Sequence, residues 1–251
     1  MSYFQLSPRL KEYLKVVEEE TGMPVKILGR PDLGLTGARA AFNYHPLYTV
    51  VVLNSSEPRL SEDLERSVAH EATHGYILHK LGYCRAVFTE NASEDVKMKA
   101  NLLFSLVEDL VVNRIIQENG FPPFGTEYLP MIKKEIEVAS AGENVGEKFY
   151  SQFTSDLELE DIIMVSRYIL SWGFLRYYPL SREVRLILQE FLEVYSKAYP
   201  HHYPHAARVK EIILENDVFT AQGECRAMQE IMRLWGFEGM VKAVSTKHPT
   251  Y

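Results

Sequence analysis

Two histidines and a glutamate lie close together in the segment SVAHEATHGYILHKLG, residues 67–82. His70 and His74 are four positions apart, and Glu71 follows the first histidine. Residues i and i+4 share one face of an α-helix, with Cβ atoms about 5–6 Å apart, so both imidazoles could bind one metal ion. Glu71 lies about a hundred degrees further round the helix, where it could take a proton from a metal-activated water. The spacing predicts a hydrolytic metal site.

The same three residues could also occur by chance on an ordinary surface helix, because short motifs recur without function. Their neighbours favour the metal site. The surrounding residues are mostly apolar or small, so we expect a buried helix, and buried histidines and carboxylates need partners. Ala69, Ala72 and Gly75 should also let other segments approach this helix closely.

At this motif the chain resembles the zincin metallopeptidases. HEATH, residues 70–74, matches their ligand helix, and LYTVVVLN, residues 47–54, lies where their substrate-lining edge strand usually precedes it. The resemblance covers roughly residues 38–118 and implies one Zn²⁺ ion per chain. The branch with a third histidine six residues after the second is excluded, because that position is Lys80. The chain is more similar to the gluzincins, which take a glutamate ligand from a later helix.

The segment NLLFSLVEDLVVNRII, residues 101–116, is where we expect the third ligand. It is apolar on all sides, as in a core helix, so Glu108 and Asp109 need a cation or hydrogen-bond donors. We assign Glu108 to the metal, and expect Asp109 to accept a hydrogen bond from a metal-bound histidine. Asn113, one turn further on, should orient Asp109. The rival assignment makes Asp109 the third ligand, because Asp109 and Asn113 have the spacing of the two acids in the gluzincin pattern, although the residue types differ. The metal-free alternative is a buried salt bridge.

Two further residues are weaker candidates for stabilising the oxyanion of the transition state. Tyr178 lies in WGFLRYYPL, residues 172–180, and His202 lies in YPHHYPHAAR, residues 199–208. Both have simpler explanations: aromatic packing at a helix end for the first segment, and a solvated loop for the second.

The elements that must position these residues are mostly helical. Short β-type stretches should come first and only helices after them, which predicts an α+β, predominantly α-helical, zincin-like fold. In it, a small N-terminal sheet packs on the active-site helix and the C-terminal half is helical. We expect a zincin-like part over residues 1–125 and a helical part over 126–251, packed as one continuous unit. Strands are expected at 25–28, 38–44 and 47–54, and helices at 8–22, 61–80, 93–118, 128–138, 157–172, 181–199, 204–215 and 220–235.

Composition narrows the functional classes. The 251 residues carry a formal net charge of −7 and no run of basic residues, which argues against a nucleic-acid partner. We find neither an apolar stretch long enough for a membrane span nor the pattern of a signal peptide, so we expect a cytoplasmic protein without a membrane partner. Cys84 and Cys225, far apart in sequence, are expected to be buried or free thiols.

The sequence thus predicts a zinc-dependent hydrolase of peptide or other amide bonds, with a peptide or protein as its substrate. The alternative is a peptide- or protein-binding module that keeps the zincin fold without proteolytic activity. Glu71 argues against that alternative, because a binding module needs no general base. The pattern specifies neither the cleavage site nor the oligomeric state.

Overall fold

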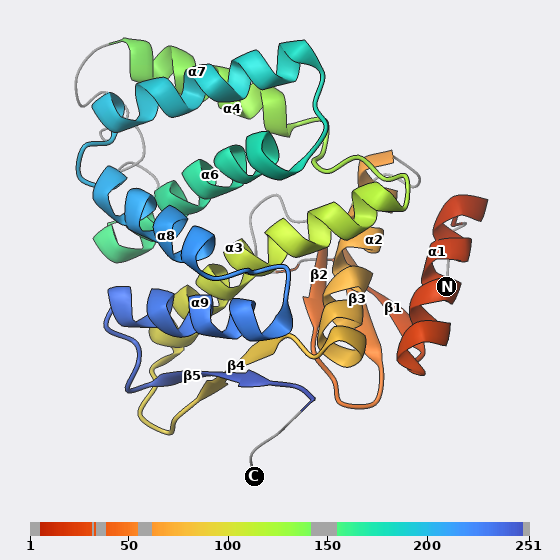
Figure 1. Ribbon diagram of the computed structural model, residues 1–251. Helices are drawn as coiled ribbons and strands as arrows, with labels where there is room; N and C mark the ends of the chain where they lie inside the picture. The colour runs from red at the N-terminus through yellow and green to blue at the C-terminus, as the bar shows by residue number, and fades with distance from the viewer. Residues whose placement is uncertain (1–5, 32, 34–38, 55–61, 142–154, 248–251) are drawn as a thin grey trace. The chain divides into compact units, whose positions relative to one another are not determined.

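The computed structural model describes residues 6–31, 33, 39–54, 62–141 and 155–247, and its fold is α+β and predominantly helical (Figure 1). The contacts between residues divide the chain into two units. Unit 1 comprises Met1–Tyr83, Val112–Gly125 and Thr246–Pro249, and unit 2 comprises Cys84–Val111, Thr126–Ser245 and Thr250–Tyr251. The expected division into residues 1–125 and 126–251 stays a prediction.

Unit 1 begins with a well-capped helix and three short strands. The hydroxyl of Ser7 accepts a hydrogen bond from the first turn of α1, and Gly22 ends the helix with a left-handed φ of 67°. The expected helix and strands of this part are all found, with small shifts at their ends. The elements are α1 (Pro8–Thr21), β1 (Val25–Arg30), β2 (Ala40–Asn43), β3 (Thr49–Asn54), α2 (Glu62–Tyr76) and a π-helical turn, η1 (Ile77–Leu81). Ser61, where we expected the second helix to begin, lies outside the described residues.

The three strands form one sheet in the order β1-β3-β2. β3 runs parallel to β1 and antiparallel to β2, with Val51 paired to Ile27 on one side and to Phe42 on the other. The expectation that residues 47–54 form an edge strand is therefore wrong. Val50, Val51, Val52 and Leu53 are all buried, and because successive side chains of a strand point to opposite faces, both faces of β3 are covered here.

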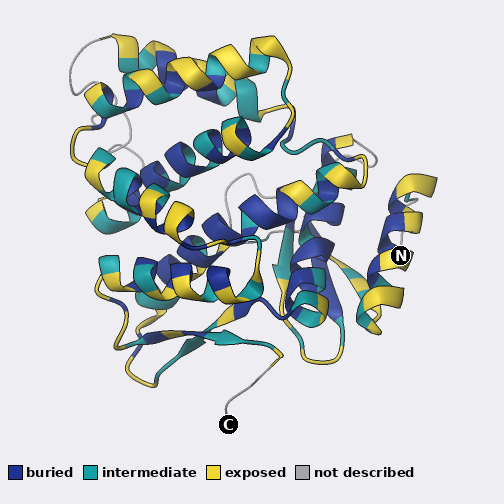
Figure 2. Cartoon of the chain, in the orientation of Figure 1, coloured by how far each residue is buried: buried dark blue, intermediate teal, exposed yellow. Residues whose placement is uncertain are grey.

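Helix α2 packs against β2 and β3 and also against α1, and most of its length is buried (Figure 2). Gly75 makes the close approach to β3 possible. A Cβ atom at Gly75 would lie 2.3 Å from Oγ1 and 2.4 Å from Cγ2 of Thr49, which is fully buried. The small residue predicted to admit a neighbouring segment does so here, and it sets the position of the helix that carries both histidines.

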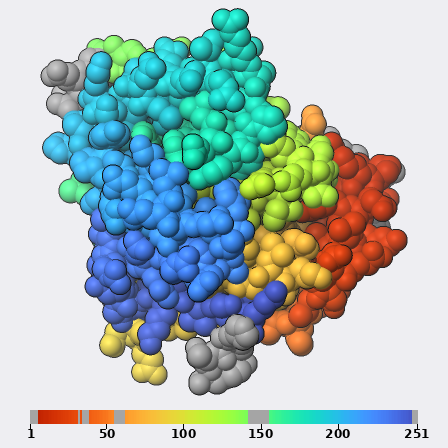
Figure 3. Space-filling view, viewed as in Figure 1, coloured from red at the N-terminus to blue at the C-terminus, as the bar shows by residue number. Residues whose placement is uncertain are grey.

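Unit 2 contains most of the helices and a second, two-stranded sheet. Within it, α4 packs on α7, α6 on α7 and α8, and α9 on α8 and β5; the outer sides of α7 and α8 form much of the surface of this unit in Figure 3. The helices are α3 (Glu94–Glu118), whose last residues belong to unit 1, α4 (Tyr128–Ser140), α6 (Leu157–Tyr177), α7 (Arg182–Ala198), α8 (Tyr203–Glu215) and α9 (Ala221–Leu234). No helix in the described ranges is long and apolar enough to cross a membrane.

Two features of unit 2 differ from what the sequence predicts. Strands β4 (Cys84–Phe88) and β5 (Val241–Ser245) pair antiparallel, although only helices were expected after residue 54. Each strand is short, and its partner is far away in sequence, so no local pattern marks the pair. The expectation of free thiols is also wrong, because Cys84 and Cys225 form a disulfide with a Cα–Cα distance of 5.4 Å, within the usual range for such a bond.

Replacing Gly75 with Ala should destabilise the protein. The added methyl group overlaps Thr49, and overpacking of this kind costs roughly 1–3 kcal/mol. Chemical denaturation should show this loss, and Thr49→Ala in the same chain should recover part of it, because the two closest atoms are then gone. Gly239→Ala is the matched control, since a Cβ there meets nothing within 4 Å. Equal stability of the Gly75→Ala and Gly239→Ala variants would contradict this packing.

Candidate metal centre

His70 and His74 face each other on successive turns of α2. Their Nε2 atoms are 3.3 Å apart, and their ring planes meet at 72°. The two residues retain only 9% and 6% exposure. Two imidazoles so enclosed need polar partners for their nitrogens, because a buried polar group without one is costly.

Asn113, on α3, determines which nitrogen of His70 carries the proton. The Nη2 group of Arg66 donates to Oδ1 of Asn113 over 3.0 Å, and Nδ1 of His70 lies 3.1 Å from the same oxygen. Since an arginine can only donate, the Asn113 atom at this point is the acceptor, and Nδ1 of His70 must donate to it. In the neutral imidazole, Nε2 of His70 is therefore the acceptor nitrogen, and it faces Nε2 of His74.

Arg66 is part of the site that the sequence analysis missed. It lies one turn before His70 on α2, and it also donates to the carbonyl oxygens of Pro122 and Pro123, over 3.1 and 2.7 Å. These three bonds tie α2 to Asn113 and to the segment that follows α3. The sequence contained one indication that Arg66 belongs to the site. It precedes the first histidine by four residues, and that spacing places both residues on the same face of the helix.

The histidine pair fits a zinc ion. With Zn–N distances of about 2.0–2.1 Å, two ligands of a tetrahedral site are roughly 3.3–3.4 Å apart, which matches the separation of the two Nε2 atoms. The tautomer of His70 fits as well, because metal-bound histidines usually donate their other ring N–H to a carbonyl or carboxylate. The metal-free alternative is a hydrogen bond from Nε2 of His74 to Nε2 of His70, which the same distance allows.

Asp109 is the acid that fits this pair. Helix α3 is continuous through both units, so Asp109 lies one turn before Asn113 on the same face. Asn113 belongs to unit 1, and its Oδ1 lies 3.1 Å from Nδ1 of His70. The continuity of the helix therefore favours the rival assignment, with Asp109 as the third ligand.

Glu108 has a different neighbour. Burial raises the pKa of Glu224, on α9, and the negative charge of Glu108 raises that pKa further. Adjacent positions of a helix are about a hundred degrees apart, so the side chains of Glu108 and Asp109 point in different directions and have different neighbours. Glu108 is itself buried, with 8% exposure.

Glu71 is the residue that the sequence predicts as the general base. It lies next to His70 on α2, and it is only partly buried. Within the described part of the chain, no hydrogen bond or ion pair engages its carboxylate. The group therefore remains able to accept a proton from a molecule that enters the site.

Strand β2 is the edge of the sheet that adjoins the histidines. The ring of Phe42 stacks on His74, with centroids 5.9 Å apart, a contact that sequence reasoning missed. β3 covers one side of β2, and no described strand pairs with the other. Because the N–H of Asn54 donates to the carbonyl of Arg39, the alternation of an antiparallel pair turns the backbone groups of Ala40 and Phe42 towards that free edge.

Thr73 connects the histidine helix to α1. Its hydroxyl lies 2.5 Å from the hydroxyl of Tyr13 and donates to the carbonyl of Ala69 over 2.6 Å. Burial raises the pKa of Tyr13 to about 12, so the phenol stays protonated at neutral pH and can donate to Thr73. This contact helps to fix α2 against α1.

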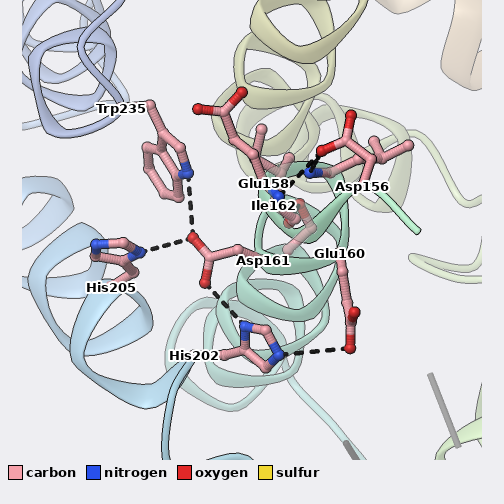
Figure 4. Close-up of polar contacts among 10 residues, drawn as sticks. Asp156, Glu158, Glu160, Asp161, Ile162, His202, His205 and Trp235 are labelled. Carbon is pink, nitrogen blue, oxygen red and sulfur yellow. Dashed lines mark hydrogen bonds and ion pairs between the residues drawn. The ribbon is translucent and has the colours of Figure 1, made fainter. Parts of the chain in front are cut away.

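The two weaker candidates have structural partners within unit 2. The hydroxyl of Tyr178 donates to the carbonyl of Leu110, in the middle of α3. His202 is buried rather than solvated, and its Nδ1 lies 3.0 Å from Oδ1 of Asp161. Figure 4 shows that the same carboxylate also forms hydrogen bonds with His205 and Trp235. In this conformation both residues support the packing of their helices, and their role towards a transition state stays a prediction.

Comparison of the chain with protein-family models, with curated proteins and with solved structures found no match. The side chains of the site are therefore the basis for proposing a function. Their types and distances are specific enough to test one residue at a time.

Zinc affinity separates the two assignments of the third ligand. Asp109→Ala should weaken zinc binding by more than the 10–100-fold typical of residues that only support a ligand, because it removes a ligand atom. Glu108→Ala should change the affinity less than that. A competition titration against a chromophoric chelator measures both, with circular dichroism as the check on folding. The reverse order would return the ligand role to Glu108.

Proposed function

We propose that this chain is a zinc-dependent hydrolase of peptide or other amide bonds, with a zincin-type site on α2. One observation carries the proposal: the Nε2 atoms of His70 and His74 are 3.3 Å apart, while Asn113 holds the other nitrogen of His70. That arrangement leaves a lone pair of His70 directed at the point between the two rings, as a metal ligand requires.

The proposed ligands are His70, His74 and Asp109. Three protein ligands leave a fourth position for water or substrate, which is typical of catalytic rather than structural zinc sites. When bound, zinc would polarise the scissile carbonyl and make a water molecule more acidic. An aspartate in place of the gluzincin glutamate makes the chain a variant of that pattern, and Asn113, one turn on, then serves His70 rather than the acid.

Glu71 is the proposed general base. It accepts the proton of the attacking water and passes it to the leaving nitrogen. Its partial burial and the lack of a partner among the described residues support this role, because a carboxylate held in an ion pair would be a weaker base. Its place beside His70 keeps it close to the metal without competing for it.

We further propose that an extended substrate pairs with β2 rather than with β3. The outward backbone groups of Ala40 and Phe42 can form hydrogen bonds with a peptide strand, as in other cases of strand addition to a sheet edge. The stacking of Phe42 on His74 would bring such a peptide next to the metal ligands. The side chains on either side of the scissile bond then determine specificity.

Replacing Glu71 with Gln tests the proposed activity. The change keeps the size and hydrogen-bonding capacity of the side chain but removes the base, and general-base assistance typically contributes about 10²–10⁴-fold. Cleavage of a broad peptide library, read by mass spectrometry on zinc-loaded protein, should fall by at least that order. Zinc content should remain that of the wild type.

Glu62→Gln is the matched control, because Glu62 is an exposed acid at the start of the same helix. Its activity should equal that of the wild type. Cleavage that persists unchanged in Glu71→Gln would mean that another group, or a contaminant, performs the hydrolysis. If zinc-loaded wild type binds peptides tightly but cuts none, the binding-module alternative replaces the enzyme.

A further inference from the structure

A second group of potential metal ligands lies entirely within unit 2. It consists of Cys84, the first residue of β4, and of Glu224 and Cys225, near the start of α9. One ligand atom from each residue lies within 4.8 Å of the other two. The two elements are held together independently of the cysteines, since β4 pairs with β5 and α9 packs on both strands.

Glu224 is the unusual member of this group. It is completely buried, and one of its oxygens, Oε2, accepts a hydrogen bond from the backbone N–H of Cys84 over 3.1 Å. The other oxygen, Oε1, is buried without a hydrogen-bond partner among the described residues. An unpaired buried carboxyl oxygen is costly, and a methionine or leucine would fill a similar volume without that cost.

The surroundings of Glu224 make a cation favourable. Burial raises the pKa of its carboxyl group, and the negative charge of Glu108 adds to that effect. A divalent ion would supply the missing partner for Oε1 and offset the repulsion between the two acids.

We propose that reduction of the Cys84–Cys225 disulfide creates a zinc site in which the two thiolates and the carboxylate of Glu224 are the protein ligands. Two sulfur donors and one carboxylate suit Zn²⁺, which binds thiolates at about 2.3 Å and carboxylate oxygens at about 2.0–2.2 Å. The Cα atoms of the two cysteines are 5.4 Å apart, so one ion can reach both sulfurs without a large movement of β4 or α9.

The two states exchange by a balanced sequence of steps. A dithiol reductant breaks the S–S bond, delivers two electrons and two protons to Cys84 and Cys225, and leaves as its own cyclic disulfide. Zinc then binds as the two thiols each release one proton and the carboxylate of Glu224 becomes its third ligand. A low-molecular-weight disulfide reverses the exchange. It takes two electrons from the thiolates, which form the S–S bond and release the zinc, and it leaves as two thiols that carry two protons from the solvent.

This site differs from the one on α2 in its donor atoms and in its dependence on redox state. The first site uses imidazole nitrogens and works in either redox state, whereas the second uses sulfur and exists only after reduction. In both states a covalent or coordinate link connects β4 to α9. The chain would therefore hold two zinc ions when reduced and one when oxidised.

Cobalt(II) distinguishes the two sites, because only thiolate ligation produces an intense sulfur-to-cobalt charge-transfer absorption in the near ultraviolet. The full chain, reduced with a dithiol and freed of reductant without oxygen, is titrated with Co²⁺. We expect this absorption to saturate, once both sites are filled, at the intensity of one thiolate-bound cobalt per chain. It should disappear when excess Zn²⁺ displaces the cobalt, and it should be absent from the oxidised protein. Cys84→Ser and Cys225→Ser should each abolish its two-thiolate intensity.

Glu224→Gln should weaken cobalt binding at this site by at least tenfold. Glu230→Gln is the matched control, because Glu230 is on the same helix and about a third exposed, and its affinity should equal that of the wild type. Circular dichroism of each sample reports folding. The proposal is overturned if reduced, folded wild type shows no charge-transfer band with excess Co²⁺, if reduction unfolds the chain, or if Glu224→Gln binds cobalt as tightly as the wild type.

Discussion

The geometry of the histidine pair depends on one shared acceptor, the side-chain oxygen of Asn113. Arg66 and His70 both donate to it, because arginine has no acceptor and the Asn113 atom between them must therefore be the oxygen. The proton of His70 is held on Nδ1, and its Nε2 lone pair faces His74. Without this constraint, two histidines four residues apart would be ambiguous, since either tautomer would satisfy a neighbouring donor or acceptor.

A second constraint fixes the position of α2, which carries the two residues that donate to Asn113. Gly75 lets the helix approach Thr49 of β3 more closely than any side chain would permit, and the hydroxyl of Tyr13 holds Thr73 from α1. The histidines are thereby fixed between a sheet and a helix, with the edge of β2 beside them. The two proposed histidine ligands are thereby arranged before a metal would arrive, which would lower the cost of binding it.

The sequence predicts the features that depend on nearby residues of one helix. It does not predict those that depend on contacts between residues far apart in the chain. The spacing of His70, Glu71 and His74 belongs to a single helix, so the geometry of that helix predicts which residues face one another. Helix α3 is apolar on every side, so nothing in its pattern shows whether Glu108 or Asp109 faces the histidines. The number of neighbours of β3, the pairing of β4 with β5 and the disulfide across 141 residues depend on contacts that no local pattern records.

Zinc content measured on oxidised protein tests the central claim most directly, because oxidation removes the cysteine site from the count. Wild type purified without chelator should contain about one zinc per chain by elemental analysis. The His70→Ala, His74→Ala double variant, shown by circular dichroism to be folded, should contain almost none. Equal zinc in the two preparations, or none in the wild type after incubation with zinc and removal of the excess, would contradict the account.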